Sequence, residues 1–360
     1  MLDPEMTVGK LGERALIKHL RSRIPTGLGV SVGIGDDAAA VETGPLTLIT
    51  TDTLVEGTHF RRDWSPPRLL GRKALTVNLA DIAAMAGIAR FATVSLCLPP
   101  DVQMGFVDGL YDGLLERASE SGVSIVGGNV ASAWGELVVD ITLIGSGDHV
   151  LTRKGAVPGD LAVVTGHLGA AAEGLRLLQQ GARLNEELFL TSTGIWTESS
   201  TEAVTHCLRA QLDPTPPLAL ARALAEQELV HAAMDISDGL SGDLLTMCGE
   251  SGLAAWLDPD GLPLDPVAAA LERARGKDAS DLALHGGEDY QFLLAIPPEK
   301  MDGLKDLAVV WDLPLTIVGQ FFEGEPSVSL NRNGEMEHLK PASYDHFRSR
   351  PTLREGSKPS

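Results

Sequence analysis

The chain has 360 residues, of which 44% are hydrophobic and 22% are charged, a balance that excludes an intrinsically disordered protein. Its formal net charge of −20 argues against nucleic acid or an anionic membrane as a partner, because like charges repel. The three cysteines form no Cys-x-x-Cys pair, so we expect buried free thiols in a reducing compartment. No signal-peptide pattern and no apolar run of transmembrane length occur, which predicts a soluble, cytoplasmic protein.

The N-terminal part is predicted to mix helices with short strands. Spacing near 3.6 residues predicts helices at 13–23, 67–89 and 106–119. Apolar runs predict strands at 46–49, 92–98, 123–126 and 137–144. The first of these strands is followed directly by Thr50, Thr51 and Asp52. Asn78 and Asp81 are three residues apart on a predicted helix and therefore point to one side.

A turn-rich junction at 153–160 predicts a domain boundary near residue 150, giving domains at 1–149 and 150–347 and a disordered tail at 348–360. After the junction we predict strands at 161–165, 291–296 and 315–318, and helices at 169–180, 217–227 and 240–250. Ser237 or Asp238 is expected to cap the last helix, and 191–201 is expected to be a loop. Helices and strands do not alternate strictly, which favours an α+β fold.

Short acidic motifs are scattered over most of the chain. They are Gly-Ile-Gly-Asp-Asp (33–37), Thr-Thr-Asp-Thr (50–53), Asn-Leu-Ala-Asp (78–81), Asp-Ile-Ser-Asp-Gly (235–239) and Gly-Gly-Glu-Asp-Tyr (286–290). A fold that gathers such carboxylates needs cations between them, because ionised carboxylates repel one another. The P-loop, the Rossmann fingerprint, zinc spacing and Gly-x-Ser-x-Gly are all missing from the sequence. The pattern favours a magnesium-dependent enzyme acting on phosphates.

Each motif also has a plain structural interpretation. The 33–37 and 127–129 stretches are typical of turns, and 235–239 is typical of a helix cap. His59 with Phe60 is more often packing than ligand binding, and Arg153 is by default a solvated charge. Against a triphosphate, however, an arginine fork and exposed glycine amides are suitable partners for phosphate oxygens.

The ordered series of motifs resembles the thiamine-monophosphate kinase family of the aminoimidazole-ribotide-synthetase-like superfamily. The likeness includes Thr-Thr-Asp-Thr-Leu-Val-Glu-Gly-x-His-Phe and Lys-Ala-Leu-x-Val-Asn-Leu-x-Asp-Ile-Ala-Ala-Met, and it runs from about Glu13 to Phe347. It implies a two-domain α+β fold and a homodimer whose N-terminal domains pair their sheets. It also implies ATP-dependent phosphorylation of thiamine monophosphate to thiamine diphosphate with Mg²⁺, the last step in making that cofactor.

The resemblance assigns roles to individual residues. The implied magnesium ligands are Asp36, Thr50, Thr51, Asp52, Asp81, Asp235 and Asp238. The implied ATP contacts are Gly128, Asn129, Arg153 and Ser237. The implied thiamine phosphate contacts are His59, Glu288 and Phe347.

Two positions depart from the family pattern. Asn129 stands where Asp is common, and its amide oxygen can ligate a cation but supplies no charge. Pro217 stands where the family often has Arg. The alternatives are another ATPase of the superfamily, acting on a ribotide, selenide or a carbamoyl group, and a non-catalytic nucleotide-binding homologue.

The implied acceptor explains why acids outnumber bases in these motifs. A phosphate monoester has a second pKa of about 6 and is largely dianionic at neutral pH, so it needs no general base. We therefore predict direct in-line transfer, without a catalytic base and without a phosphoenzyme.

Overall fold

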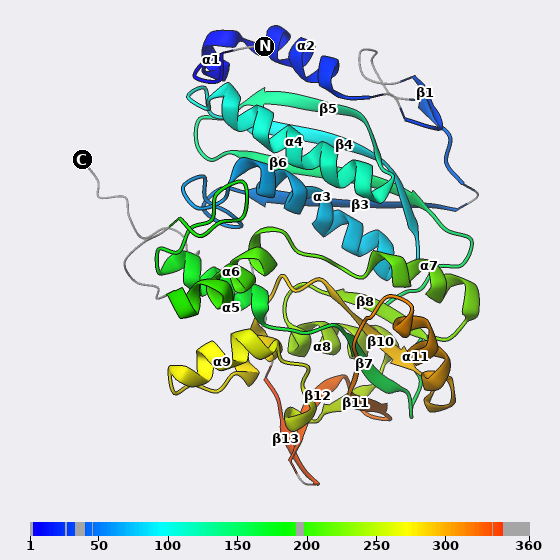
Figure 1. Ribbon diagram of the computed structural model, residues 1–360. Coiled ribbons are helices and arrows are strands. Elements are labelled where there is room, and N and C mark those ends of the chain that lie inside the picture. Colours follow the sequence, from blue (N-terminus) through cyan, green and yellow to red (C-terminus); the bar gives the residue numbers. More distant parts are fainter. Residues whose placement is uncertain are drawn as a thin grey trace.

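The computed structural model describes residues 3–25, 27–32, 40–44, 46–191, 198–332 and 334–340. Its N-terminal part is built on a four-stranded sheet of order β3-β6-β4-β5 (Figure 1). The strands are β3 (Thr47–Val55), β4 (Ile88–Leu98), β5 (Ser124–Ser132) and β6 (Val138–Ser146). The β4–β5 pair is parallel and the other two pairs are antiparallel. A short β1–β2 pair and two helices precede the sheet: α1 (Val8–Leu11), α2 (Glu13–Arg23), β1 (Val30–Val32) and β2 (Ala40–Val41).

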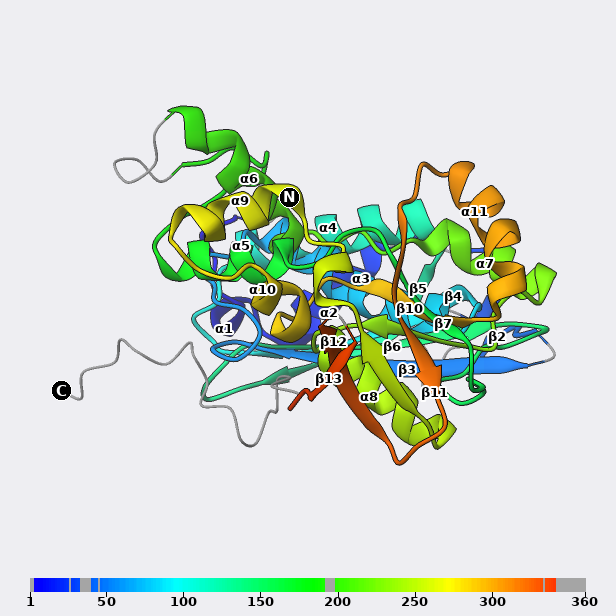
Figure 2. The same cartoon turned by 90° about the horizontal axis from the view of Figure 1, so that it is seen from below.

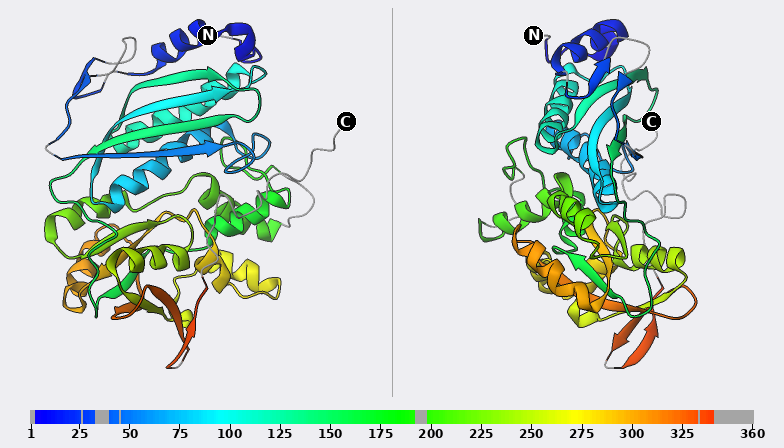
Figure 3. Two further views of the ribbon diagram at one scale, coloured as in Figure 1. Left: turned by 180° about the vertical axis from the view of Figure 1, so that it is seen from behind. Right: turned by 90° about the vertical axis from the view of Figure 1, so that its right-hand side faces the viewer.

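Two long helices, α3 (Pro67–Ala84) and α4 (Met104–Ser121), cover one face of this sheet (Figure 3). Alternate strand residues such as Leu54, Leu96 and Ile141 point to the helices and form the first core. The residues between them are exposed or half-buried, and Ile49 is 68% exposed. Among the described residues, no helix packs on this second face, which we call the open sheet face.

The helices α3 and α4 approach each other through two glycines. A Cβ atom on Gly71 would lie 1.9 Å from the carbonyl oxygen of Leu110. A Cβ atom on Gly113 would lie 1.7 Å from the carbonyl oxygen of Arg68. The two backbones are therefore in direct contact, which no larger residue at these positions allows.

The C-terminal part contains a seven-stranded sheet of order β13-β12-β9-β11-β7-β10-β8, antiparallel except for β12–β9. Its strands are β7 (Leu161–Thr165), β8 (Ala232–Ile236), β9 (Ala254–Leu257), β10 (Gln291–Ile296), β11 (Leu315–Phe322), β12 (Ser327–Arg332) and β13 (Glu335–His338). Its helices are α5 (Ala170–Gln179), α6 (Glu198–Leu212), α7 (Leu218–Gln227), α8 (Leu240–Ser251), α9 (Pro266–Ala274), α10 (Ser280–His285) and α11 (Met301–Val309), with short 3₁₀ turns at Pro259–Gly261 and Pro298–Lys300. Helices α5, α6, α9 and α10 gather at one end of the molecule, and α7 and α11 lie at the other (Figure 2).

Helix α3 joins the two parts. Its last turn places Ala83 and Ala84 in a core whose other buried members, such as Val163, Leu220 and Phe292, come from the C-terminal part. Arg72 on α3 and Arg117 on α4 both pair with Asp213, at 3.0 and 2.7 Å. The two parts are thus packed through apolar side chains and partly buried ion pairs.

The α+β class predicted from the sequence is confirmed, with local differences. The helix predicted at 67–89 ends at Ala84, because the chain turns through Ala86, whose φ is +58°, and β4 then begins at Ile88. The strand predicted at 123–126 continues to Ser132, so 127–129 is strand and not a turn. Part of the predicted loop at 191–201 lies outside the described residues, and α6 begins at Glu198. The 348–360 tail also lies outside the described residues.

Candidate functional site

Two carboxylates from distant elements meet where β3 faces α3. Strand alternation turns Thr50 and Asp52 to the same side as the buried Leu48 and Leu54, toward the helix. The Thr50 hydroxyl donates to Asp81 Oδ2 at 2.6 Å, and the side chains of Asp52 and Asp81 share a hydrogen bond. Burial, followed by the neighbouring charges of Asp81 and Asp140, raises the pKa of Asp52 to about 7. The site therefore favours a neutralising partner between these acids.

Thr51 belongs to the open sheet face and not to the side of Asp52. Its hydroxyl is 3.4 Å from Asp140 Oδ1, and the hydroxyl of Thr53 donates to Asp140 Oδ2 at 2.6 Å. Asp140 stands on β6 directly opposite Thr53. Thr50 and Thr51 are adjacent in sequence, but their side chains are on opposite faces of the sheet.

A third carboxylate comes from the C-terminal part. Asp235, near the end of β8, is 4% exposed, and burial followed by the charges of Asp81 and Asp243 raises its pKa well above the usual value. The positive charge of Arg153 opposes this shift. The charge of Asp81 thus acts on both Asp52 and Asp235. We call Asp52, Asp81 and Asp235 the acidic group.

The turn after Asp235 is held by a further acid. Asp243 Oδ2 accepts hydrogen bonds from the backbone amides of Ser237 and Asp238, both at 3.1 Å. The expectation that Ser237 or Asp238 caps the next helix is wrong, because the N-cap of α8 is Gly239, with φ +98°, and no side chain caps it. Asp243, from the first turn of the helix, instead fixes the backbone that carries Ser237 and Asp238.

The donors of the acidic group suit a hard cation. Within the described ranges, no three His, Cys, Asp or Glu side chains lie close enough together to enclose a metal ion by themselves. Mg²⁺ commonly binds through one or two carboxylates, keeps several waters and takes its other ligands from substrate phosphates. The pair Asp52–Asp81 with the Thr50 hydroxyl and nearby Asp235 fits an ion that arrives with a nucleotide.

Gly128 and Asn129 lie apart from the acidic group. Both are exposed on β5, where Ser95 of β4 is opposite Asn129. The sheet order separates β5 from β3 by three strand spacings, roughly 14 Å. A Cβ atom on Gly128 would lie 2.1 Å from the carbonyl oxygen of Val94, so the position requires glycine. The structure does not bring Asn129 into contact with Asp52 or Asp81 of the same chain.

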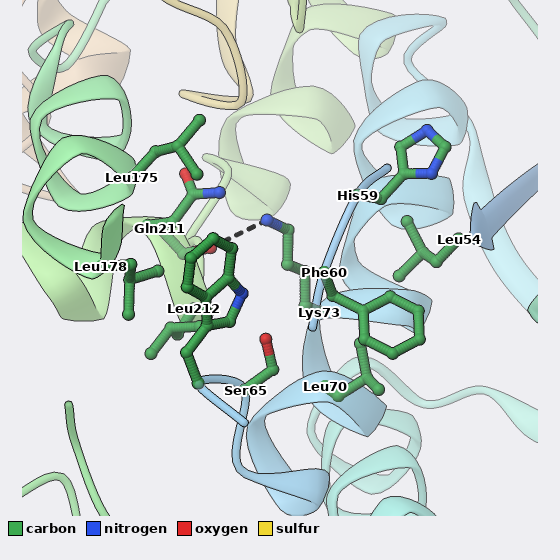
Figure 4. Close-up of a pocket in the computed structure, with 11 residues that line it drawn as sticks. Leu54, His59, Phe60, Ser65, Leu70, Lys73, Leu175, Leu178, Gln211 and Leu212 are labelled. Atoms are coloured by element: carbon green, nitrogen blue, oxygen red, sulfur yellow. Dashed lines mark hydrogen bonds between the residues drawn. The ribbon is translucent and has the colours of Figure 1, made fainter. Parts of the chain in front are cut away.

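A buried lysine organises the other predicted contacts. Lys73 of α3 reaches Glu288 Oε1 at 2.6 Å. It also donates to the carbonyl oxygen of Gln211 at 2.9 Å (Figure 4). The side-chain amide of Gln211 donates to Glu288 Oε2, so both carboxylate oxygens of Glu288 have partners. Glu288 has φ +68°, and its amide donates to the carbonyl oxygen of Ser237 at 2.8 Å. Glu288 is thereby connected to the turn that follows Asp235.

His59 lies across from Gln211 in the same pocket (Figure 4). Its Nδ1 accepts a hydrogen bond from the amide of Val55 at 3.0 Å, which fixes the orientation of the ring. His59 and Glu288 are thus brought to one region, because Lys73 and Gln211 line the pocket with His59 and both contact Glu288. Asp36 and Phe347 lie outside the described residues.

Sequence reasoning missed four residues that the structure places in this region: Lys73, Asp140, Gln211 and Asp243. Two of them carried a usable signal. Lys73 is a charge inside an apolar helix, and Asp140 is an acid in the middle of an apolar strand. Gln211 carried none, because only the tertiary fold brings it to Glu288.

Comparison with known proteins identifies the class of protein to which both parts of the chain belong. Residues 35–146 match the family of the AIR synthase related protein, N-terminal domain, and residues 157–331 match the corresponding C-terminal domain. A thiamine-monophosphate kinase of Aquifex aeolicus is 31% identical over 343 residues, which is 95% of this chain and 100% of the relative. The chain belongs to the thiamine-monophosphate kinase family, a family of enzymes.

Solved structures agree with this assignment. The thiamine-monophosphate kinase of Stenotrophomonas maltophilia K279a superposes with a TM-score of 0.76 at 34% identity, covering 89% of this chain and 96% of that one. AaThiL complexed with AMPPCP and TMP superposes with a TM-score of 0.73 at 30% identity, covering 95% and 99%. Within the described residues, every helix is too short or too polar to cross a membrane.

Proposed function

We propose that this protein transfers the terminal phosphoryl group of ATP to thiamine monophosphate, giving thiamine diphosphate. Membership of the kinase family and the likeness to a structure complexed with AMPPCP and TMP support the choice of substrates. The observation that carries the proposal is that Asp81 interacts with both Asp52 and Asp235, so that three elements converge on one acidic group. We place the activity in the cytoplasm and retain 1–149 and 150–347 as the two domains.

The roles follow from charge. Asp52, Asp81 and Asp235, with the Thr50 hydroxyl, would hold Mg²⁺, which neutralises phosphate oxygens when bound. Asp36 and Asp238 complete the proposed metal set, and Thr51 is left out of it because its side chain is on the opposite face of the sheet from Asp52. Without a cation the acidic group repels both substrates, since a triphosphate and a phosphate monoester are polyanions. The residues of the chain therefore act by holding the reactants in line, and the acceptor dianion needs no base.

Arg153, Ser237, Gly128 and Asn129 are the proposed ATP contacts. Arg153 is exposed, and its charge opposes the rise that burial causes in the pKa values of Asp235 and Asp243, so a guanidinium is available beside the acidic group. Phosphate oxygens accept two parallel hydrogen bonds from an arginine fork. His59, Glu288 and Phe347 are the proposed contacts of thiamine phosphate.

We also propose a homodimer in which two copies pair their open sheet faces. This face presents Ile49, Ile144 and Val138 between threonines, and Ile49 is 68% exposed. An exposed apolar sheet face is a common site of protein association. The pairing agrees with the assembly that the family resemblance implies.

A product assay with ATP, thiamine monophosphate and Mg²⁺ tests the function. We expect Asp81→Ala and Asp52→Ala to lose at least about 1,000-fold in turnover while keeping the wild-type circular dichroism spectrum, because transition-state charge is no longer neutralised. Asp302→Ala is the control, since Asp302 is a 95% exposed acid on α11.

Three outcomes separate the alternatives. Near-normal activity in either variant contradicts the proposed metal site. A thermal shift by ATP without product favours a nucleotide-binding homologue, and ATP hydrolysis that does not depend on thiamine monophosphate favours another ATPase of the superfamily.

A further inference from the structure

Tyr290 occupies a strained position at the end of the 286–290 motif. Its φ is +51° and that of Glu288 is +68°, a left-handed conformation that a bulky residue rarely adopts. Such strain persists only where the surrounding structure holds it, and it is concentrated at functional sites. The amide of Tyr290 donates to the carbonyl oxygen of Ile236 at 2.8 Å, next to Asp235. The backbone of Tyr290 is therefore held against the end of β8.

Two further contacts hold the 286–290 turn. The carboxylate of Asp289 is in a residue that is 8% exposed, and it accepts a hydrogen bond from the amide of Gly169 at 2.9 Å, at the start of α5. A Cβ atom on Gly287 would lie 2.4 Å from the carbonyl oxygen of Ser237, so the backbones of these two turns are in direct contact. The turn is thus fixed before any ligand binds, as a preorganised site requires.

The ring of Tyr290 packs against helix α3. It forms a buried cluster with Val77 and Ala80. Asp81 follows Ala80 directly, and Lys73 lies one helical turn before Val77. Tyr290 therefore lies between the region around Lys73 and the acidic group.

Four carboxylates act on the phenol of Tyr290. Burial, followed by the charges of Glu288, Asp52, Asp235 and Asp81, raises the pKa of Tyr290 well above its usual value. The residue is 8% exposed, and within the described part of the chain its hydroxyl has no hydrogen-bond partner. A phenol can donate a hydrogen bond, whereas ionised carboxylates only accept. The hydroxyl is therefore a neutral donor beside four acids.

We propose that Tyr290 is a further substrate-contacting residue, its hydroxyl donating a hydrogen bond to a phosphate oxygen of thiamine monophosphate. The inference rests on the proposed function and deepens it. Phosphate oxygens are strong acceptors, so a phosphate placed between Glu288 and the acidic group needs donors that carboxylates do not supply. The acceptor phosphate fits better than ATP, because Glu288 in the same turn is a proposed contact of thiamine phosphate.

The test is Tyr290→Phe, which removes the hydroxyl and keeps the ring that packs against α3. In steady-state assays with ATP and Mg²⁺, we expect kcat/KM for thiamine monophosphate to fall about tenfold to 100-fold, the effect of losing a hydrogen bond to a charged group. The KM for ATP should stay within about twofold of the wild-type value. Loss of packing alone would disturb the binding of both substrates, and the KM for ATP would then rise as well.

Tyr111→Phe is the matched control. Tyr111 is 4% exposed on α4 in the first core; burial raises its pKa and the charge of Arg23 opposes the rise, with none of the four carboxylates involved. Loss of this hydroxyl should leave both kinetic constants unchanged. If Tyr290→Phe does not fold, Tyr290→Met also lacks the hydroxyl and should show the same selective loss.

The remaining outcomes are distinct. A folded Tyr290 variant that keeps the wild-type kcat/KM for thiamine monophosphate overturns the inference while the kinase assignment stands. A rise in the KM for ATP as large as the loss for thiamine monophosphate also overturns it. If the wild-type enzyme makes no thiamine diphosphate, both the inference and the proposed function fall.

Discussion

Asn129 lies on β5, three strands away from Asp52, on a row of the sheet that also includes Ser95 and Asp140. An amide oxygen at this position supplies no charge to a cation, whereas a carboxylate does. We expect Asn129→Asp to lower the Mg²⁺ concentration needed for half-maximal turnover, on the order of threefold to tenfold. A magnesium titration at saturating ATP measures the change.

The control for that substitution is Asn331→Asp on β12, where the side chain accepts from the amide of Gly334 at 2.8 Å and a carboxylate can do the same. It should leave the magnesium titration unaltered. An identical titration curve for Asn129→Asp and wild type would argue against any ligand role for residue 129.

His206 and Asp265 form a pair with a defined pH dependence. Their side chains are 2.9 Å apart, and Asp265 also accepts from the amides of Val267 and Ala268 at the start of α9. The hydrogen bond to Asp265 raises the pKa of His206 above 6.5, against the effect of burial. Burial acts to raise the pKa of Asp265, but the hydrogen bond from His206 and the two amides lower it below 3.8.

The pair therefore stabilises the fold fully between about pH 4 and pH 6.5, and the contribution is lost as pH rises through the raised pKa of His206. It is also lost as pH falls through the lowered pKa of Asp265. His206 is 47% exposed, so His206→Gln should lower the free energy of unfolding by only about 0.5–1 kcal/mol at pH 5.5. The difference from wild type should shrink toward zero at pH 9. Urea unfolding at both pH values measures this difference. A loss of unfolding free energy that is the same at pH 5.5 and pH 9 would contradict the ion pair.

Short motifs identify residues better than they identify side-chain directions. Asp52, Asp81 and Asp235 stand out in the sequence because each is an acid beside an apolar run, and the fold does bring Asp52 and Asp235 within electrostatic reach of Asp81. Thr51 shared a motif with Thr50, yet the twofold period of a strand turns it to the other face. Gln211 could not be found from the sequence, because its partners on α3 and near β10 are distant along the chain.

Among the elements, the α3–α4 crossing depends most on a single residue type. Gly113→Ala places a methyl group 1.7 Å from the carbonyl oxygen of Arg68, so the two helices must separate. We expect the free energy of unfolding to fall by about 1–3 kcal/mol or more, as in other overpacked cores. Denaturant titration measures it.

Gly249 provides the matched control. It lies in α8, it is exposed, and nothing lies within 4 Å of an added Cβ atom. Gly249→Ala should raise the free energy of unfolding by up to about 1 kcal/mol through helix propensity alone. Equal effects of the two substitutions would show that the close approach of α3 and α4 is not a determinant of stability.

Element boundaries were hardest to predict at glycines, because glycine occurs both in turns and at close backbone contacts within strands. The pair Gly127–Gly128 is a common turn signal, but here β5 continues through it, because the absence of a side chain lets Gly128 pass close to Val94. The long helices followed from their apolar spacing. The late strands β9, β12 and β13 were not predicted, because they are short and because β9 pairs with β11 and β12, which are distant from it in sequence.

At the scale of the whole molecule, the open sheet face leads to a prediction about assembly. In the proposed homodimer Ile49 of each copy would be buried. Ile49→Asp would therefore take two carboxylates out of water, one from each copy. We expect Ile49→Asp to raise the dimer dissociation constant by about 100-fold, equivalent to ~2.8 kcal/mol. Sedimentation velocity over a concentration series measures the dissociation.

Val309→Asp should sediment as wild type does, since Val309 is 77% exposed on α11, far from the sheet in the views of Figure 1 and Figure 2. If the wild-type protein sediments as a monomer at micromolar concentration, the proposed homodimer is contradicted. An Ile49→Asp protein that stays dimeric would place the interface elsewhere.

Asp81 stands on the helix that enters both cores, and its two acidic neighbours belong to different parts of the chain. Any ligand that draws Asp52, Asp81 and Asp235 together is thermodynamically linked to the packing of one part on the other. Without such a ligand, the repulsion among these carboxylates weakens the packing between the two parts of the chain. Binding of ATP with Mg²⁺ should therefore strengthen the packing of the two parts on each other. The two parts should unfold more cooperatively with this ligand than without it.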